Sequence, residues 1–194
     1  MKLYLAPGAC SLADHIALTE AGIDFETIQV DLQTRRTEHG DNFVDVNPKG
    51  YVPALALDDG ELLTENVAIL DWIAAEKPGL APQGRIGRSR NIEMLAFLAT
   101  EIHRPFMRWM FSPADAEKTA ARQAIVERMA LIAGKLDGHY IFGDAFCTAD
   151  AFLYVMVRWS RELGFDLSGT LIEYAERVEA RPSVQKALLA EGLS

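Results

Sequence analysis

Residues 1–11 read MKLYLAPGACS, and this stretch decides the expected fold. The apolar run at residues 3–5 is typical of a short strand, and Pro7-Gly8 predicts a tight turn after it. The turn delivers Cys10 to the start of an amphipathic helix that begins near Ser11. A thiol there faces unpaired N–H groups and the positive end of the helix dipole, so we expect a lowered pKa and a thiolate. A lone cysteine is more often a small buried apolar residue, but this placement favours chemistry.

The composition restricts the class of protein. A chain of 194 residues, 49% hydrophobic and 24% charged, is long enough for one domain or two small ones. Its net charge of −9 argues against nucleic acid as a partner. Two cysteines far apart make no disulfide framework and suit a reducing cytoplasm. We expect no membrane association, because no apolar run approaches the roughly 18 residues that span a bilayer and the N-terminus reads as a strand.

The first 76 residues alternate between strand and helix patterns. Apolar side chains at Leu12, Ile16 and Ala17 have helical spacing, and Gly22 is a natural helix stop. Asp58-Asp59-Gly60 is a strong hairpin signal. The order is βαβ, then a hairpin, then a helix, which resembles thioredoxin. The expected elements are a strand at 2–5, a helix at 11–21, strands at 25–30, 53–57 and 62–63, and a helix at 67–76.

The rest of the chain has a different character. Residues 77–87, KPGLAPQGRIG, hold two prolines and three glycines and predict a linker. Beyond it every periodic segment has helical spacing, so we expect a second, all-helical domain. The expected helices are at 88–111, 115–137, 149–163, 169–180 and 183–190.

Two further motifs stand where a thioredoxin-like unit binds ligands. Val52-Pro53 precedes the third strand; in such folds this proline is cis, and the residue before it can pair its backbone with a bound peptide. An ordinary strand entry is the alternative. Glu65 and Asn66 open a helix, where N–H groups suit a carboxylate and the Glu65 side chain suits an ammonium. A plain helix cap is the alternative there.

Four stretches together resemble the glutathione transferases, most closely the bacterial beta class. They are APGACSL at 6–12, VNPKGYVPAL at 46–55, LTENVAI at 63–69 and TEIH at 100–103. The resemblance covers nearly the whole chain. It implies a thioredoxin-like glutathione-binding domain at 1–76, a linker at 77–87 and an all-helical domain with the cosubstrate pocket at 88–194.

The resemblance also implies where glutathione would bind as a cosubstrate. Its cysteinyl part would pair with the backbone of Val52, and its γ-glutamyl end would lie on Glu65 and Asn66. Its glycine carboxylate would reach Arg35, where the class usually has lysine; a solvated loop is the alternative reading of this arginine. The other implied glutathione contacts are Ala9, Cys10, Tyr51, Pro53, Glu101 and His103.

Three residues are the implied catalytic set. Cys10 would lie beside the glutathione sulfur, where two thiols can form a mixed disulfide. Ser11 either donates a hydrogen bond to a thiolate or only starts the helix. His103 would reach the cleft between the domains and, since imidazole titrates near neutral pH, hold glutathione or keep its thiol ionised. A structural histidine is the alternative.

Several apolar residues after His103 could form the cosubstrate pocket, namely Phe106, Trp109, Met110 and Phe111. Aromatic residues at this spacing more often make core, so we expect one or two of them to face the cleft. Cys147 stands where the family has Ser or Thr three residues before Asp150, as a helix cap. We interpret it as structural, because a thiol is a poor acceptor compared with a hydroxyl.

Two departures from the family pattern affect the mechanism. The beta class often has a tyrosine where this chain has Leu5, whereas Tyr4 should point to the other face of its strand. Ala96 stands where the class tends to have a polar contact from the partner subunit, which weakens the expected glutathione affinity.

The resemblance therefore predicts a cytoplasmic glutathione transferase, a homodimer that conjugates glutathione to small electrophilic, apolar compounds. No Cys, His and carboxylate cluster has metal-ligand spacing, so no metal is expected. One alternative is glutathione-dependent thiol–disulfide exchange through Cys10. Another is a non-catalytic protein that binds glutathione or other ligands.

Overall fold

The computed structural model describes residues 1–136 and 138–193. Two of the expected ranges end outside it, the helix at 115–137 on Asp137 and the helical domain at 88–194 on Ser194. None of the helices in the described part of the chain is long and apolar enough to cross a membrane.

A five-stranded sheet with three helices forms the first part of the molecule. Its elements are β1 Lys2–Leu5, α1 Leu12–Ala21, β2 Glu26–Asp31, β3 Arg36–Thr37, α2 Phe43–Val46, β4 Ala54–Ala56, β5 Leu62–Thr64 and α3 Asn66–Glu76. The strand order is β3-β2-β1-β4-β5. β1 runs parallel to β2, while β4 is antiparallel to both β1 and β5. The predicted order of elements is confirmed, and β3 and α2 are additions that the polar loop after β2 did not predict.

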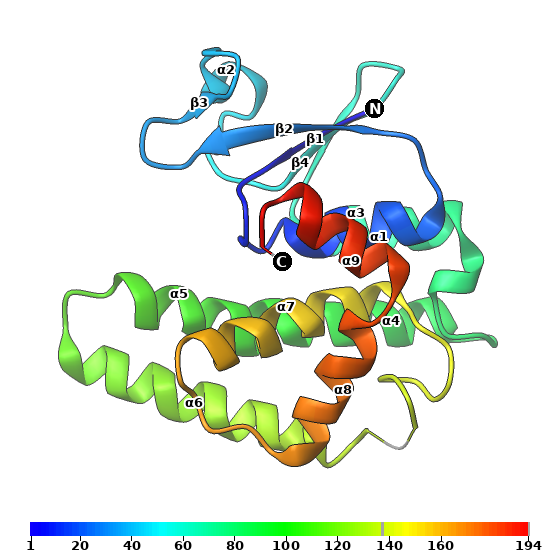
Figure 1. The fold of residues 1–194 in the computed structure, drawn as a ribbon, viewed down its shortest axis with the longest axis vertical. Coiled ribbons are helices and arrows are strands. Elements are labelled where there is room, and N and C mark those ends of the chain that lie inside the picture. Colours follow the sequence, from blue (N-terminus) through cyan, green and yellow to red (C-terminus); the bar gives the residue numbers. More distant parts are fainter. Residues whose placement is uncertain (137, 194) are drawn as a thin grey trace.

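The two faces of the sheet are covered differently. Alternation along β1 sends Leu3 and Leu5 into the large core cluster, on the face where α1 and α3 pack (Figure 1). Tyr4 points to the opposite face, as predicted, and joins a smaller cluster. Its ring packs against Phe43 of α2, with the ring centroids 5.4 Å apart. Tyr4 therefore lies on the other side of the sheet from the cluster that contains Cys10.

The rest of the chain is helical, as its spacing predicted. After a short 3-10 turn at Pro78–Leu80 come α4 Gly87–Phe97, a π-helical segment Leu98–His103, α5 Arg104–Phe111, α6 Asp115–Ala133, α7 Thr148–Glu162, α8 Gly169–Glu179 and α9 Pro182–Ala190. Helix α9 returns to pack along α1, which brings the last described residues close to the loop after β1 (Figure 1).

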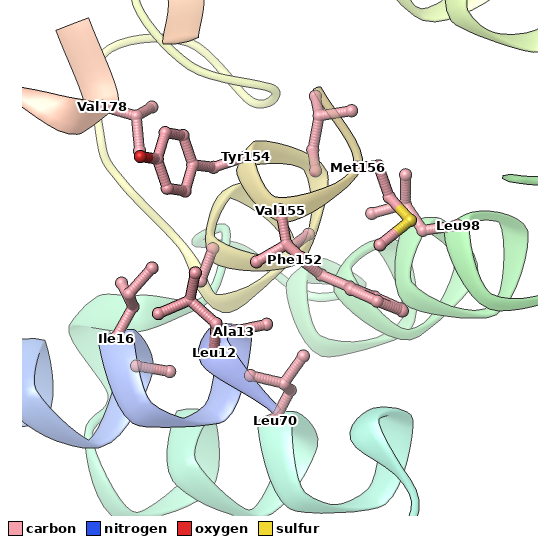
Figure 2. Close-up of a cluster of buried hydrophobic side chains, with 14 of the residues drawn as sticks. Leu12, Ala13, Ile16, Leu70, Leu98, Phe152, Tyr154, Val155, Met156 and Val178 are labelled. Carbon is pink, nitrogen blue, oxygen red and sulfur yellow. The ribbon is translucent and has the colours of Figure 1, made fainter. Parts of the chain in front are cut away.

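Helix α7 is the centre of the molecule. Twelve of its fifteen residues are buried, so other elements must cover it on nearly every side. Figure 2 shows Leu12 and Ile16 of α1 on the side of α7 that carries Val155, and Leu98 beside Met156. Each fully buried side chain of this size stabilises the fold by about 1.5–3 kcal/mol. The sheet and the helical part therefore share one continuous core.

The long helix expected at 88–111 changes its geometry in the middle. In the π-helical segment the Arg104 N–H donates to the Ala99 carbonyl, five residues back. Pro105 gives the reason, because it lacks an N–H and its ring would clash with the Glu101 carbonyl four residues back. A turn with one extra residue avoids the normal hydrogen-bond pattern at this point. His103 is the last residue of that turn.

Asp150 closes the N-terminus of α7. Its Oδ2 accepts the Cys147 N–H at 2.9 Å and the Cys147 thiol at 3.0 Å. Its Oδ1 accepts the Ile141 N–H at 2.9 Å and the Tyr174 hydroxyl at 3.0 Å. Cys147 is thus structural, as predicted, and its thiol donates a hydrogen bond to the Asp150 carboxyl group.

Replacing Asp150 by alanine should lower the free energy of unfolding by about 3 kcal/mol, because the Ile141 N–H loses its acceptor, the buried Tyr174 hydroxyl loses one of its two acceptors, and the cap of α7 is removed. Urea unfolding followed by circular dichroism measures the change. Asp144→Ala is the matched control: this side chain is exposed, and its loss should cost less than about 0.5 kcal/mol. Equal losses in the two variants would contradict the structural role of Asp150.

Candidate functional site

A cavity of about 790 Å³ lies between the sheet and the helical part of the molecule. Its first wall comes from the loop after β1, the loop before β4 and the start of α3. Its second wall comes from the π-helical segment, α5 and the C-terminal end of α7. The sequence-predicted residues that it brings together are Ala9, Cys10, Arg35, Tyr51, Val52, Glu65, His103, Met110 and Phe111.

A second cavity of about 300 Å³ lies along the same boundary. It shares Cys10, Val52, Glu65 and His103 with the first cavity, and it adds the predicted residues Pro53 and Asn66. The remaining four, namely Ser11, Glu101, Phe106 and Trp109, line neither cavity. Within residues 1–136 and 138–193, no three His, Cys, Asp or Glu side chains gather as metal ligands would.

The loop between β1 and α1 is held in place by the C-terminal part of the chain. Gly8 donates its N–H to Glu191 at 2.9 Å, and its carbonyl accepts the Trp159 indole N–H at 2.8 Å. The other Glu191 oxygen pairs with Nδ1 of the buried His15 at 2.8 Å. Gly8 has a φ of 72°, a conformation that glycine adopts at low cost. Sequence reasoning missed this anchor, since its three partners are distant in the chain and match no motif.

Cys10 lies at the floor of the cavity, just before α1. It is 9% exposed, and its thiol points to the Val52 carbonyl with a sulfur–oxygen distance of 3.8 Å. Burial, as the main cause, and the neighbouring Asp14 together raise the pKa of the thiol to about 12. Backbone N–H groups at the helix start act in the opposite direction but are outweighed. The prediction of a lowered pKa is therefore wrong, because the lost hydration exceeds the stabilisation from the helix end.

The hydroxyl of Ser11 is used within its own loop. It accepts the Ala6 N–H at 3.2 Å and lies 3.4 Å from the Ala6 carbonyl, to which it donates. Ser11 is fully buried, and it stands directly before α1 without capping it through its side chain. Its role is to close the loop that presents Cys10.

The peptide bond between Val52 and Pro53 is cis, as expected for this fold. The turn before it is fixed by Asn47, whose side-chain amide donates to the Tyr51 carbonyl at 2.8 Å. Pro53 leads directly into β4, so the backbone of Val52 is presented at the rim of the sheet beside Cys10. An extended ligand can align with a backbone placed in this way.

Glu65 stands between β5 and α3 in an unusual backbone conformation. Its φ of 75° and ψ of 128° are costly for a residue with a side chain, and such outliers concentrate at functional sites. Its carboxylate accepts the Lys49 ammonium at 2.5 Å and the Tyr51 hydroxyl at 2.8 Å. The Lys49 hydrogen bond is the main reason why the pKa of Glu65 is lowered. Glu65 is therefore a carboxylate at the cavity wall that already holds an ammonium.

Two predicted ligand residues differ in what they offer to the cavity. The Asn66 side chain is turned inward and donates to the Cys10 carbonyl at 3.0 Å and to Asp14 at 2.7 Å. Only the backbone at the start of α3 is then left for a ligand. Arg35 lines the cavity, and its guanidinium lies against Gly50, 3.4 Å from where a β-carbon would be.

His103 faces both cavities from the π-helical turn. Its ring packs beside Trp159 and Phe152, with centroid distances of 5.6 and 5.9 Å. Its Nε2 is buried without a hydrogen-bond partner among the described residues. Burial lowers the pKa of the imidazole to about 4. His103 is therefore neutral at physiological pH, and the expectation that it titrates near neutrality is wrong.

The second wall is one face of the helix that follows His103. Met107, Met110 and Phe111 line the cavity, at spacings of four, seven and eight residues from the histidine. Phe106 is fully buried against Trp159 and Phe165, and Trp109 packs on Phe165. As expected, two of the four candidates, Met110 and Phe111, face the cleft. Counting from His103 in helical steps would have found Met107.

Glu101 points to a different neighbour. Its carboxylate pairs with Arg128 of α6 at 3.1 Å, away from both cavities. Glu101 precedes His103 by only two residues, and side chains two apart on a helix do not share a face. The structure therefore separates these two predicted ligand residues.

Comparisons with known proteins agree with this geometry. Residues 9–76 match the family model described as glutathione S-transferase, N-terminal domain, and residues 95–186 match the C-terminal domain of that family. The chain is 44% identical to glutathione S-transferase GstA of Escherichia coli O157:H7, with both chains covered completely. A beta-class enzyme of Sphingomonas chungbukensis is similar in structure, with a TM-score of 0.92, 47% identity and full coverage of both chains. A sphingomonad glutathione S-transferase solved with glutathione has a TM-score of 0.93, 46% identity and full coverage of both chains.

The lowered pKa of His103 predicts a specific pH effect on stability. Between about pH 6.5 and pH 4 the unfolded chain takes up a proton that the folded protein resists, so His103 destabilises the fold as the pH falls through this range. In His103→Leu this contribution is absent. The unfolding free energy of the wild type should therefore fall more on acidification than that of the variant.

Urea unfolding at a series of pH values measures this difference. His39→Leu is the control, since His39 lies in an exposed loop. A difference between wild type and His103→Leu that stays constant from pH 7 to pH 4.5 would show that His103 is not held neutral.

Proposed function

Because the chain belongs to the glutathione S-transferase family, we propose that it is a beta-class transferase that joins the glutathione thiolate to small apolar electrophiles. One observation carries this proposal. A single cavity has a buried thiol, a free strand rim and an ionised carboxylate on one wall and an apolar helical face on the other.

The polar wall suits glutathione group by group. The cysteinyl residue pairs with the backbone of Val52, which brings its sulfur beside Cys10. The γ-glutamyl carboxylate binds the N–H groups at the start of α3, and its ammonium binds Glu65. The glycine carboxylate binds Arg35, whose planar guanidinium can form two parallel hydrogen bonds with it.

Lys49 occupies the place that the ligand ammonium would take at Glu65. The side chains of this pair are 45% and 50% exposed, so the interaction contributes only about 0–1 kcal/mol. The ammonium of glutathione can therefore displace Lys49. The displaced lysine remains at the cavity wall, where it adds positive charge near the glycine carboxylate.

The catalytic contribution comes from two neutral donors. Cys10 is a thiol and His103 a neutral imidazole, so each can donate a hydrogen bond to the glutathione sulfur. A donor aimed at the place where negative charge develops stabilises the thiolate without adding a second negative charge. The remaining contribution is placement of the electrophilic carbon close to that sulfur.

The apolar wall defines the class of electrophile. Met107, Met110, Phe111 and Leu163 offer no charged group to a cosubstrate. Methionine side chains adapt to irregular shapes, which suits a range of small aromatic compounds. Aryl halides and epoxides are the first compounds to test.

Thiol–disulfide exchange is the second candidate, and the position of Cys10 in the cavity favours it. The thiolate of Cys10 would attack a glutathione mixed disulfide, and free glutathione would then resolve the enzyme-bound disulfide. The raised pKa of Cys10 argues against this activity as the main one, because only the thiolate is nucleophilic. A non-catalytic binding protein is the third candidate, supported by Leu5 and Ala96 at positions where the family tends to have polar residues.

We also propose that the protein acts as a homodimer in the cytoplasm, with no metal and no nucleic acid or membrane partner. The dimer rests on family membership, and the compartment is supported by two buried, unpaired thiols. Sedimentation velocity gives the mass of the assembly directly.

Calorimetric titration with reduced glutathione tests the binding site. Wild type should bind saturably, and Glu65→Gln should bind at least about tenfold more weakly, because the ligand ammonium loses a charged partner. Glu61→Gln makes the same change on the exposed hairpin and should bind like wild type. Absence of saturable binding at millimolar glutathione would overturn the transferase proposal. It would also exclude glutathione as the ligand of a non-catalytic binding protein.

Substitutions of Cys10 separate conjugation from exchange. Cys10→Ser keeps a donor at the sulfur, so conjugation of an aryl halide should stay within about tenfold of wild type, whereas Cys10→Ala should lose more. Both variants should lose disulfide exchange completely. Steady-state rates with an aryl halide and with a glutathione mixed disulfide provide the comparison. Equal loss of both activities in Cys10→Ser would favour a nucleophilic role for Cys10.

A further inference from the structure

Three exposed apolar side chains gather around the larger cavity. Among the described residues, seven large hydrophobic side chains are exposed, and three of them, Leu32, Tyr51 and Phe111, line this cavity. Single exposed hydrophobic residues are common on protein surfaces, whereas a group of them around one cavity marks a binding surface. Tyr51 already has a partner, because its hydroxyl donates to Glu65. Leu32 and Phe111 remain, and they are 46% and 75% exposed.

Leu32 lies in a turn with a well-defined backbone, between β2 and β3. The Asp31 carboxylate accepts the Gln33 N–H at 2.8 Å, and the Asp31 carbonyl accepts the Arg35 N–H at 2.7 Å. These hydrogen bonds hold the turn that also brings Arg35 to the cavity wall. The sheet part of the molecule therefore presents an apolar side chain next to the cation proposed for the glycine carboxylate.

Phe111 is the outer end of the apolar wall on α5. This wall becomes more exposed along its length: Nε2 of His103 is buried, Met107 and Met110 are partly buried, and Phe111 is largely exposed. His103 and Phe111 are eight residues apart, which corresponds to about 12 Å along a helix axis. A cosubstrate that reacts beside His103 therefore has a continuous apolar surface of this length ahead of it.

The length of this wall distinguishes between cosubstrates. A single small ring beside His103 contacts the inner part of the wall and leaves Phe111 in water. A longer apolar arm removes water from Leu32 and Phe111 together, because the two side chains belong to opposite walls of one cavity. Burial of apolar surface is favourable roughly in proportion to its area, so the outer residues reward the longer ligand.

We propose that Leu32 and Phe111 determine specificity: they form an outer apolar subsite for the far end of the cosubstrate. Among apolar electrophiles, those with an extended arm are then preferred to those with one small group. The subsite continues the cavity that is proposed to hold glutathione, so this inference rests on the proposed function. It adds a residue of the sheet part, Leu32, to the recognition of the cosubstrate.

Calorimetric titration with S-methyl-, S-butyl- and S-octylglutathione tests the subsite without requiring turnover. Each compound has its alkyl group on the sulfur, as a conjugation product does. Full burial of one CH₂ group strengthens binding about fourfold, so wild-type affinity should rise at least about twofold for each added CH₂. In Phe111→Ala and in Leu32→Ala, the loss of affinity should be about fivefold greater for the octyl than for the methyl compound.

Two controls match these variants in exposure. Leu189 on α9 is 72% exposed and Ile86 before α4 is 44% exposed, and neither lines the two cavities. Leu189→Ala and Ile86→Ala remove similar exposed side chains and should bind all three compounds like wild type. All four positions are on the surface, so these variants should fold.

Rates with ethyl and hexyl isothiocyanate give the kinetic counterpart. The glutathione sulfur adds to the central carbon of the N=C=S group, the nitrogen takes up a proton, and no group leaves. The ratio of kcat/KM for the hexyl compound to that for the ethyl compound should fall about fivefold in Phe111→Ala. It should stay at the wild-type value in Leu189→Ala.

The outcomes separate this inference from the proposed function. If none of the three S-alkylglutathiones binds, the glutathione site is wrong and the subsite is overturned with it. If they bind with affinities that do not depend on chain length, or if Phe111→Ala and Leu32→Ala weaken all three equally, the subsite alone is overturned. A fall in the sedimenting mass of either variant, with an unchanged dependence on chain length, would instead show that a second copy of the chain covers these residues.

Discussion

The packing of α1 against α7 is the contact on which the rest of the molecule depends. Neither wall of the cavity is complete within one part of the chain, so the distance from Cys10 to His103 is fixed only because the two parts cannot slide. Apolar side chains of α1 interlock with a helix that is buried on nearly every side. The hydrogen bond from Trp159 to the Gly8 carbonyl and the one from the Gly8 N–H to Glu191 extend this contact to the loop that presents the thiol. The same packing contact therefore determines both the stability of the core and the geometry of the site.

The site combines a buried floor with a solvent-exposed rim. Cys10 and His103 lie at the floor, where burial favours the neutral form of each group. Glu65, Lys49 and Arg35 lie at the rim, where water keeps charged groups ionised at little cost. This division assigns binding of a charged ligand to the rim. The reacting sulfur can then be placed in a region of low dielectric, where neutral donors act most strongly.

Local patterns in the sequence predicted the fold well, and they predicted the site less completely. The Pro7-Gly8 turn, the hairpin at Asp58-Asp59-Gly60 and the spacing of the helices depend on neighbours in sequence, so each could be identified directly. The state of Cys10 could not, because the pKa of its thiol depends mainly on how much water the folded chain removes from around it. Glu101 illustrates a second limit, since its direction follows from the geometry of a π-helical turn that only Pro105 signals.

That π-helical turn also sets the phase of the helix that contains it. Each residue of an α-helix advances the next side chain by about 100° around the axis, so one extra residue rotates everything that follows by about that angle. The face of α5 that looks into the cavity is therefore offset from the face of α4 that packs against α7. Deleting one residue between Leu98 and His103 and replacing Pro105 would restore an uninterrupted phase and turn Met107, Met110 and Phe111 away from the cavity together. A change of length at this one turn can thus replace a whole wall of the pocket, which point substitutions could achieve only one side chain at a time.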